Sequence, residues 1–293
     1  MNQKDQAIAA YEKLVTGYPD TEVLGHALFE LGNLLYDAKR FKEAIPRYEA
    51  AAARTVKELQ PKVYYKLGLA YLEEKVPGKA ADAFSKLVAE FPQSSLAPEG
   101  QYRLGRALQL QGKRAAAIQA FQKAIAAKPG KELTELAMFY TAECYRDEGN
   151  WAKGITAYKS AIARFPQSPL IQQMRYGKGV CAQHLGAYRD AVEAYKAVIS
   201  GPGTETAARA QFGLAECSML QGRYQEAIKE FLRIEILYGF DEWRAAGVYM
   251  AGKCAEKMKD KDRARTYYQK VLDNEKYRTT PYEAKARAAL KGL

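Results

Sequence analysis

The chain has 293 residues, of which 48% are hydrophobic and 27% are charged, with a formal net charge of +11 at pH 7. This composition is typical of a globular chain. No apolar run is long enough to cross a bilayer, so no transmembrane segment is expected in these residues.

The chain is built from copies of one short unit. A small residue returns every 36 or 37 positions, and an aromatic residue follows it four positions later. The small residues are Ala7, Ala44, Ala80, Ala117, Gly154, Ala191, Ala227 and Ala264, and the aromatic residues are Tyr11, Tyr48, Phe84, Phe121, Tyr158, Tyr195, Phe231 and Tyr268. Eight copies in register indicate a tandem array of one structural unit.

Two further positions complete seven of the units. A glycine or alanine precedes the small residue by twelve positions, at Gly32, Gly68, Gly105, Ala142, Gly179, Ala215 and Gly252. An aromatic residue lies three positions earlier again, at Phe29, Tyr65, Tyr102, Phe139, Tyr176, Phe212 and Tyr249. Offsets of three and four place residues on one helical face, and a gap of twelve spans a turn between two helices.

Each unit is therefore predicted to be a helical hairpin. Glycine often marks the turn, at Gly112, Gly149, Gly186 and Gly222. We expect the small residues at tight helix crossings, where a large aromatic ring fills the adjacent space. Two linkers also predict capped helix starts, because Ser168 precedes Pro169 and Thr280 precedes Pro281.

One unit carries a specific family pattern. The segment Tyr64-Tyr65-Lys66-Leu67-Gly68-Leu69-Ala70-Tyr71, followed by Ala80, Phe84 and Phe91-Pro92, resembles a tetratricopeptide repeat. The resemblance covers the whole chain, although the early tryptophan of the family is missing and the period exceeds the usual ~34 residues. The linkers Tyr18-Pro19-Asp20-Thr21, Phe91-Pro92-Gln93-Ser94 and Phe165-Pro166-Gln167-Ser168 resemble those of a bacterial envelope subgroup. That subgroup includes the periplasmic coordinator of the Tol-Pal system and the repeat lipoprotein of the outer-membrane protein assembly machine.

The resemblance implies an all-α fold, a right-handed α-solenoid of about seven and a half repeats plus a C-terminal capping helix. We expect a single solenoid domain over residues 1–293, because each unit packs only on its neighbours. Its parts are a half repeat at 1–23, repeats at 24–59, 60–96, 97–133, 134–170, 171–206, 207–243 and 244–280, and a capping helix at 281–293. Because the half repeat lacks its first helix, we expect the natural chain to extend upstream.

The four cysteines occupy equivalent positions in successive repeats, at Cys144, Cys181, Cys217 and Cys254. Earlier repeats hold Ala70 and Ala107 there. Equivalent positions in stacked hairpins are ~8–10 Å or more apart, beyond the ~7 Å limit for a disulfide. We therefore predict small buried thiols rather than a disulfide or a metal site.

Catalytic chemistry is weakly supported. The segment Gly247–Cys254 nearly matches a phosphate-binding loop, but it lacks the final Ser or Thr and is predicted to lie inside a helix. The two histidines, His26 and His184, belong to different repeats, and no nucleophile motif is present. We predict a protein that is not an enzyme, with no catalytic residues, no metal site and no cofactor.

The predicted functional surface is the wall of first helices, which the resemblance places on the concave side. An aromatic row beside mixed charges suits an extended peptide or a helix of another protein. The predicted contact residues are Phe29, Asn33, Tyr65, Tyr102, Arg106, Phe139, Glu143, Arg146, Tyr176, Phe212, Glu216, Tyr249 and Lys253. The alternative is that the aromatic residues only fill gaps between hairpins.

The function predicted from these features is a protein–protein interaction scaffold of the bacterial cell envelope, periplasmic or associated with the outer membrane. No small-molecule substrate is expected, and peripheral membrane association stays open. A cytoplasmic adaptor or regulatory module is the alternative. A third possibility is a basic nucleic-acid-binding solenoid, because residues 242–293 hold 13 Lys or Arg and 7 Asp or Glu. We favour a solvated helix face for those charges.

Overall fold

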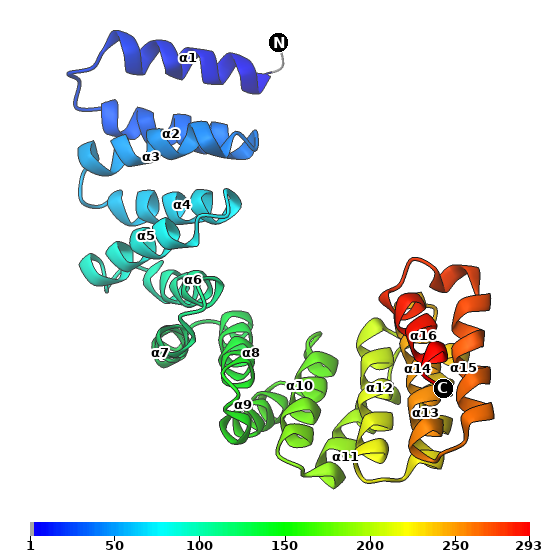
Figure 1. The fold of residues 1–293 in the computed structure, drawn as a ribbon. Helices are drawn as coiled ribbons and strands as arrows, with labels where there is room; N and C mark the ends of the chain where they lie inside the picture. Colours follow the sequence, from blue (N-terminus) through cyan, green and yellow to red (C-terminus); the bar gives the residue numbers. More distant parts are fainter. Residues whose placement is uncertain (1–2) are drawn as a thin grey trace. The chain divides into compact units, whose positions relative to one another are not determined.

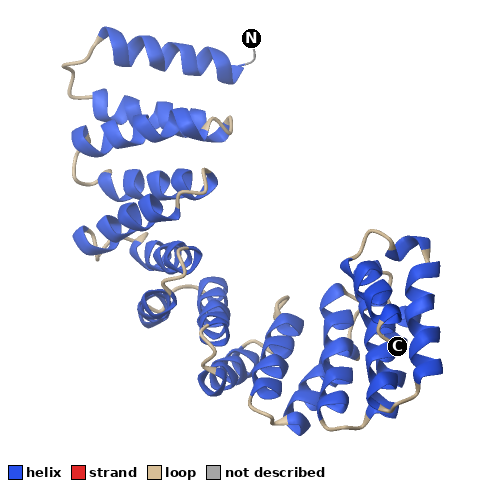
Figure 2. Ribbon diagram, viewed as in Figure 1, coloured by secondary structure: helices blue, strands red, loops and turns tan. Residues whose placement is uncertain are grey.

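The computed structural model describes residues 3–293 (Figure 1). Within that range the chain forms sixteen α-helices and one short 3₁₀ helix, and no strand (Figure 2). The chain divides into two compact units, Met1–Glu148 and Gly149–Leu293. Each unit is an α-solenoid of helical hairpins, as the repeat pattern predicts. That the two units form a single solenoid stays a prediction.

The first unit contains three hairpins between two single helices. Helices α2 and α3, α4 and α5, and α6 and α7 pair within hairpins, α1 packs on α2, and α8 packs on α7. Their bounds are α1 Gln3–Gly17, α2 Leu24–Asp37, α3 Phe41–Arg54, α4 Gln60–Glu73, α5 Pro77–Glu90, α6 Ala97–Leu110, α7 Arg114–Ala126 and α8 Lys131–Asp147.

The second unit has the same plan. Helices α10 and α11, α12 and α13, and α14 and α15 form hairpins, α9 packs on α10, and α16 packs on α14 and α15. The first helices α10, α12, α14 and α16 also contact one another in succession, so they form a continuous layer. The bounds are α9 Trp151–Arg164, α10 Ile171–His184, α11 Tyr188–Ile199, α12 Glu205–Leu220, α13 Tyr224–Leu237, α14 Asp241–Lys257, α15 Lys261–Asp273, η1 Glu275–Tyr277 and α16 Pro281–Lys291.

The hairpins are closed by an aromatic ring that lies against a glycine. A Cβ placed on Gly105 would lie 2.6 Å from Phe121 Cε1, closer than van der Waals contact allows. The same contact joins Gly32 to Tyr48, Gly68 to Phe84, Gly179 to Tyr195 and Gly252 to Tyr268. These rings are buried to 1% exposure or less. The prediction of close helix crossings at the small residues is confirmed.

The hairpin turns follow the expected glycine chemistry at four positions and depart from it at three. Gly112, Gly149, Gly186 and Gly222 have φ between 72° and 74°, a region that glycine enters without steric cost. Lysine takes the left-handed conformation in the turns that lack glycine, at Lys39, Lys75 and Lys259.

The predicted helix caps are wrong in detail. Helix α10 begins at Ile171, so Ser168 lies before it, where Ser168 Oγ accepts a hydrogen bond from Leu170 N at 2.8 Å. Helix α16 does begin after Thr280, but the Thr280 hydroxyl donates to Tyr277 O at 2.7 Å. Both hydroxyls are used by the preceding turn because a nearby backbone group competes for them.

Candidate functional site

The predicted aromatic row contributes mainly to packing between helices. Six rings of the row lie against the aromatic ring of their own second helix, with centroid separations from 5.1 Å for Phe212 and Phe231 to 6.1 Å for Tyr65 and Phe84. The same pairing is found for Phe29, Tyr102, Tyr176 and Tyr249.

The exposure of these rings differs along the row. Three of them, Phe29, Tyr102 and Phe139, are at most 8% exposed. Burial assigns these three rings to packing inside the protein. The half-buried rings are those of Tyr65, Tyr176, Phe212 and Tyr249. Contact with a partner stays a prediction for the whole row, and only the half-buried rings offer surface for it.

Two of the predicted polar residues are engaged within the first unit. Asn33 Oδ1 accepts a hydrogen bond from the buried Tyr48 hydroxyl at 2.9 Å. The Arg106 guanidinium lies 3.7 Å from the centre of the Tyr140 ring, a cation–π contact. These side chains therefore support the hairpins that carry them.

The predicted charged residues differ in their pairing. Glu143 forms an ion pair with Arg146 at 2.6 Å, and Lys253 forms one with Glu256. Glu216 has no cationic group within 4 Å among residues 3–293, so it is the one carboxylate of the predicted set without an ion pair.

The Glu216 carboxylate is nevertheless held in place. Gln183 Nε2 donates to Glu216 Oε2 at 3.1 Å, and the Tyr195 hydroxyl donates to Gln183 Oε1 at 2.8 Å. Burial raises the pKa of Glu216, and the hydrogen bond from Gln183 and the charge of the His184 imidazole oppose this in part. The chain of hydrogen bonds thus fixes a half-buried acidic group on α12.

Glu216 lies in a pocket of the second unit with a volume of about 240 Å³. Its walls come from three first helices and from Tyr195 of α11. The first helices contribute Tyr176, Val180 and His184 on α10, Arg209, Phe212 and Glu216 on α12, and Trp243 on α14. Because these helices are neighbours in the layer of first helices, three repeats build one site. The structure thus brings together Tyr176, Phe212 and Glu216 of the predicted set.

Aromatic contacts hold the pocket walls together. Trp243 meets Phe212 edge to face at 5.5 Å, and the Arg209 guanidinium lies 4.8 Å from the centre of the Tyr176 ring. At one end of the pocket, Trp151 stacks on His184 at 4.1 Å. Sequence reasoning missed Arg209, Trp243 and His184, although the presence of only two tryptophans was a usable signal.

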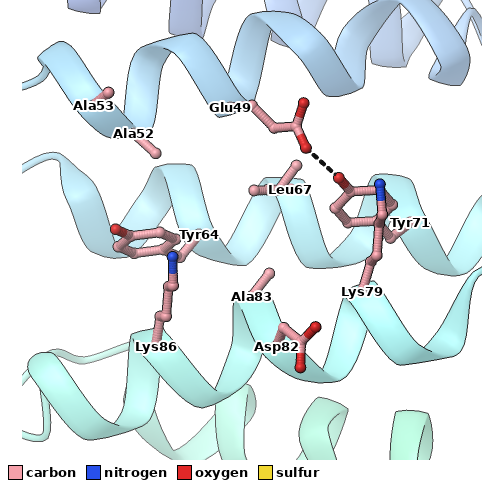
Figure 3. A pocket seen from close by; sticks show the side chains of 10 residues that line it. All are labelled: Glu49, Ala52, Ala53, Tyr64, Leu67, Tyr71, Lys79, Asp82, Ala83 and Lys86. Atoms are coloured by element: carbon pink, nitrogen blue, oxygen red, sulfur yellow. Dashed lines mark hydrogen bonds between the residues drawn. The ribbon is translucent and has the colours of Figure 1, made fainter.

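A second, larger hollow lies in the first unit, between α3, α4 and α5, and has a volume of about 410 Å³. Figure 3 shows Leu67 in its middle and a tyrosine toward each end, with Lys86 reaching toward Tyr64 and Lys79 toward Tyr71. The two lysine Nζ atoms lie 5.7 Å and 5.4 Å from those ring centres.

The hollow follows from one small residue on α3. Ala52 lines it, eight positions after the small residue Ala44. Five other repeats hold a branched side chain at the corresponding position, at Val88, Ile125, Ile162, Ile199 and Leu272, and one holds Glu235. A missing branched side chain leaves its volume empty where neighbours cannot close in.

Comparison with known proteins decides the family. A family model described as tetratricopeptide repeat matches residues 29–95, 94–132, 102–169, 142–205 and 188–242, and a second model of that description matches 1–21 and 247–275. The chain belongs to the tetratricopeptide repeat family. Tetratricopeptide repeat proteins mediate protein–protein interactions, so another protein is the expected class of partner.

Several solved structures share the tetratricopeptide fold. A tetratricopeptide repeat protein from Parabacteroides merdae has 14% identity and a TM-score of 0.60, with 91% of this chain and 97% of that chain covered. The C-terminal part of a repeat protein from Cytophaga hutchinsonii has 14% identity and a TM-score of 0.68, with 89% and 99% covered.

A third structure is YrrB, a tetratricopeptide repeat protein with an unusual peptide-binding site, at 19% identity and a TM-score of 0.55 over 69% of this chain and 97% of that one. Such low identities show the fold alone. No curated protein matches the chain. None of the helices within residues 3–293 has the length and apolar character needed to cross a membrane.

Proposed function

We propose that this chain is a non-enzymatic scaffold that holds a segment of a partner protein in the pocket formed by α10, α12 and α14. The family supports a protein partner. The pocket adds a concave surface on which Tyr176, Phe212 and Trp243 offer half-buried rings. Aromatic anchors in a partly desolvated hollow are typical of the residues that dominate binding energy at protein interfaces.

The observation that carries this proposal is the unpaired carboxylate of Glu216. A half-buried charge without a counter-charge is unfavourable, and a protein usually pairs it or exposes it. Here the hydrogen bond from Gln183 orients the carboxylate without neutralising it. A positively charged group from a partner would supply the missing counter-charge.

The basic C-terminal region does not favour a nucleic-acid ligand. Arg263 and Arg265 lie 3.8 Å and 3.5 Å from carboxylates of their own helix region, Asp260 and Asp262. Lys261 Nζ donates to Leu293 O at 2.7 Å. Much of this positive charge is therefore met within the chain, as expected for a solvated helix face.

We also propose the bacterial cell envelope as the setting, periplasmic or associated with the outer membrane. This part of the proposal rests on the Tyr-Pro and Phe-Pro linkers alone. Fractionation of the source cells, with the tagged protein expressed from its natural gene, tests it. Recovery of the protein with the cytoplasm would reject the envelope and favour the cytoplasmic adaptor.

Site-specific crosslinking tests the binding proposal. A photoreactive phenylalanine analogue at Phe212 should capture one partner segment, which mass spectrometry identifies. The same analogue at Tyr18, an exposed aromatic residue of the first unit, serves as the matched control. Trp243→Ala should weaken binding of the identified segment by about 2 kcal/mol or more, the loss typical of a hot-spot residue. Identical crosslinks from both positions, or no effect of Trp243→Ala, would reject the pocket as the binding site.

A further inference from the structure

Two unpaired charges of opposite sign lie along one face of α12, and both border the pocket. Arg209 and Glu216 are seven residues apart, which corresponds to two helical turns and about 10 Å along the axis. The part of the chain that the structure describes contains no carboxylate within 4 Å of Arg209 and no cation within 4 Å of Glu216. The pocket is therefore positive at one end and negative at the other.

The aromatic contacts of Arg209 leave its hydrogen-bonding edge available. Its guanidinium lies near the faces of Tyr176 and Trp243, at 4.8 Å and 5.9 Å from the ring centres. Stacking of this kind orients the planar group and leaves its N–H donors directed away from the rings. A carboxylate is the ligand that matches such a fork of donors.

The separation of Arg209 and Glu216 along α12 constrains the ligand that can reach both charges. A polyproline II segment brings residues i and i+3 to the same face with a spacing of about 9 Å. That spacing is close to the rise of about 10 Å between the two residues along the axis of α12.

We propose that this pocket binds an extended, polyproline II-like peptide segment with one basic and one acidic side chain three positions apart. The basic side chain pairs with Glu216 and the acidic side chain with Arg209. The two residues between them lie on the rings of Tyr176, Phe212 and Trp243. This inference rests on the proposed function, because it specifies the chemistry of the partner at the same site.

Four fluorescein-labelled synthetic peptides test the charge pattern by fluorescence anisotropy with the full chain. Their cores are Lys-Pro-Pro-Glu, Lys-Pro-Pro-Lys, Glu-Pro-Pro-Glu and the uncharged Gln-Pro-Pro-Gln. We expect the mixed-charge peptide to bind at least about tenfold more tightly than the other three. Glu216→Lys should shift the preference to the Glu-Pro-Pro-Glu peptide, and Arg209→Glu should shift it to the Lys-Pro-Pro-Lys peptide.

The reciprocal shifts make the test independent of losses in stability, because each variant gains one ligand as it loses another. Arg209 is exposed, so Arg209→Glu keeps the fold even if Glu216→Lys does not. Equal binding of all four peptides, or variants without the expected change in preference, would overturn the inference. If binding of the crosslinked natural segment depends on Trp243 but not on Arg209 or Glu216, the proposed function is supported and this inference is wrong.

Discussion

The contact between Gly105 and the Phe121 ring predicts a change of sign in a double-mutant cycle. In the natural background, Gly105→Ala places a methyl group 2.6 Å from Phe121 Cε1, 2.7 Å from Cδ1 and 3.0 Å from Cζ. Overpacking of this kind costs about 1–3 kcal/mol. Replacing glycine by alanine within a helix stabilises the helix by about 1 kcal/mol. The net loss of unfolding free energy should therefore reach about 2 kcal/mol.

Phe121→Val removes all three contacted atoms and changes the outcome. In that background Gly105→Ala should stabilise the protein by up to about 1 kcal/mol, because only the gain in helix propensity remains. The coupling free energy should then be about 1–3 kcal/mol. Urea unfolding followed by far-UV circular dichroism measures all four corners of the cycle. Gly78→Ala is the matched control, since nothing lies within 4 Å of its added methyl group. If the effects of Gly105→Ala and Phe121→Val on the free energy of unfolding add to within about 0.5 kcal/mol, the steric explanation is refuted.

Three further predictions follow from packing and burial. Burial raises the pKa of Cys144 to about 12, above the usual value of about 8.5, so its contribution to stability is complete below about pH 8.5 and is lost as pH rises toward 12. The urea midpoint of unfolding should therefore decrease as the pH rises from about 8 to about 10.5, and this decrease should be less steep in Cys144→Ala. A urea midpoint that does not change with pH would contradict this prediction. Ala52→Val should fill the hollow beside α4 and raise stability by up to about 1 kcal/mol, measured as a higher urea midpoint, whereas a loss would show that the space cannot take the side chain. Ala117→Leu should cost about 1–3 kcal/mol and the exposed Gln119→Leu almost nothing, and equal melting temperatures would contradict the repeat register.

The hairpins could be predicted from the sequence because their packing is periodic. The small and aromatic residues recur at fixed spacing, and in five hairpins the ring meets a glycine of its own hairpin, so one local rule describes these copies. Buried free thiols were predicted by the same logic, and the structure confirms them at Cys144, Cys181, Cys217 and Cys254.

The pocket could not be predicted in this way because it depends on departures from the repeat. Arg209 and Trp243 occupy no recurring position, and they meet only because α12 and α14 are neighbours. The hollow at Ala52 is likewise an exception within a recurring branched position. The predicted helix caps were wrong for another reason. The hydroxyls of Ser168 and Thr280 can form a hydrogen bond either with the helix or with the turn before it.

The glycines beneath the aromatic rings also give this protein a set of internal reporters. A proton held close to an aromatic ring experiences the ring's magnetic field, which displaces its nuclear magnetic resonance signal. Gly32, Gly68, Gly105, Gly179 and Gly252 each meet a ring of a single hairpin. Their signals should return to ordinary positions only when that hairpin opens. A spectrum recorded along a denaturation series would thus follow the separate opening of five hairpins, without any attached label.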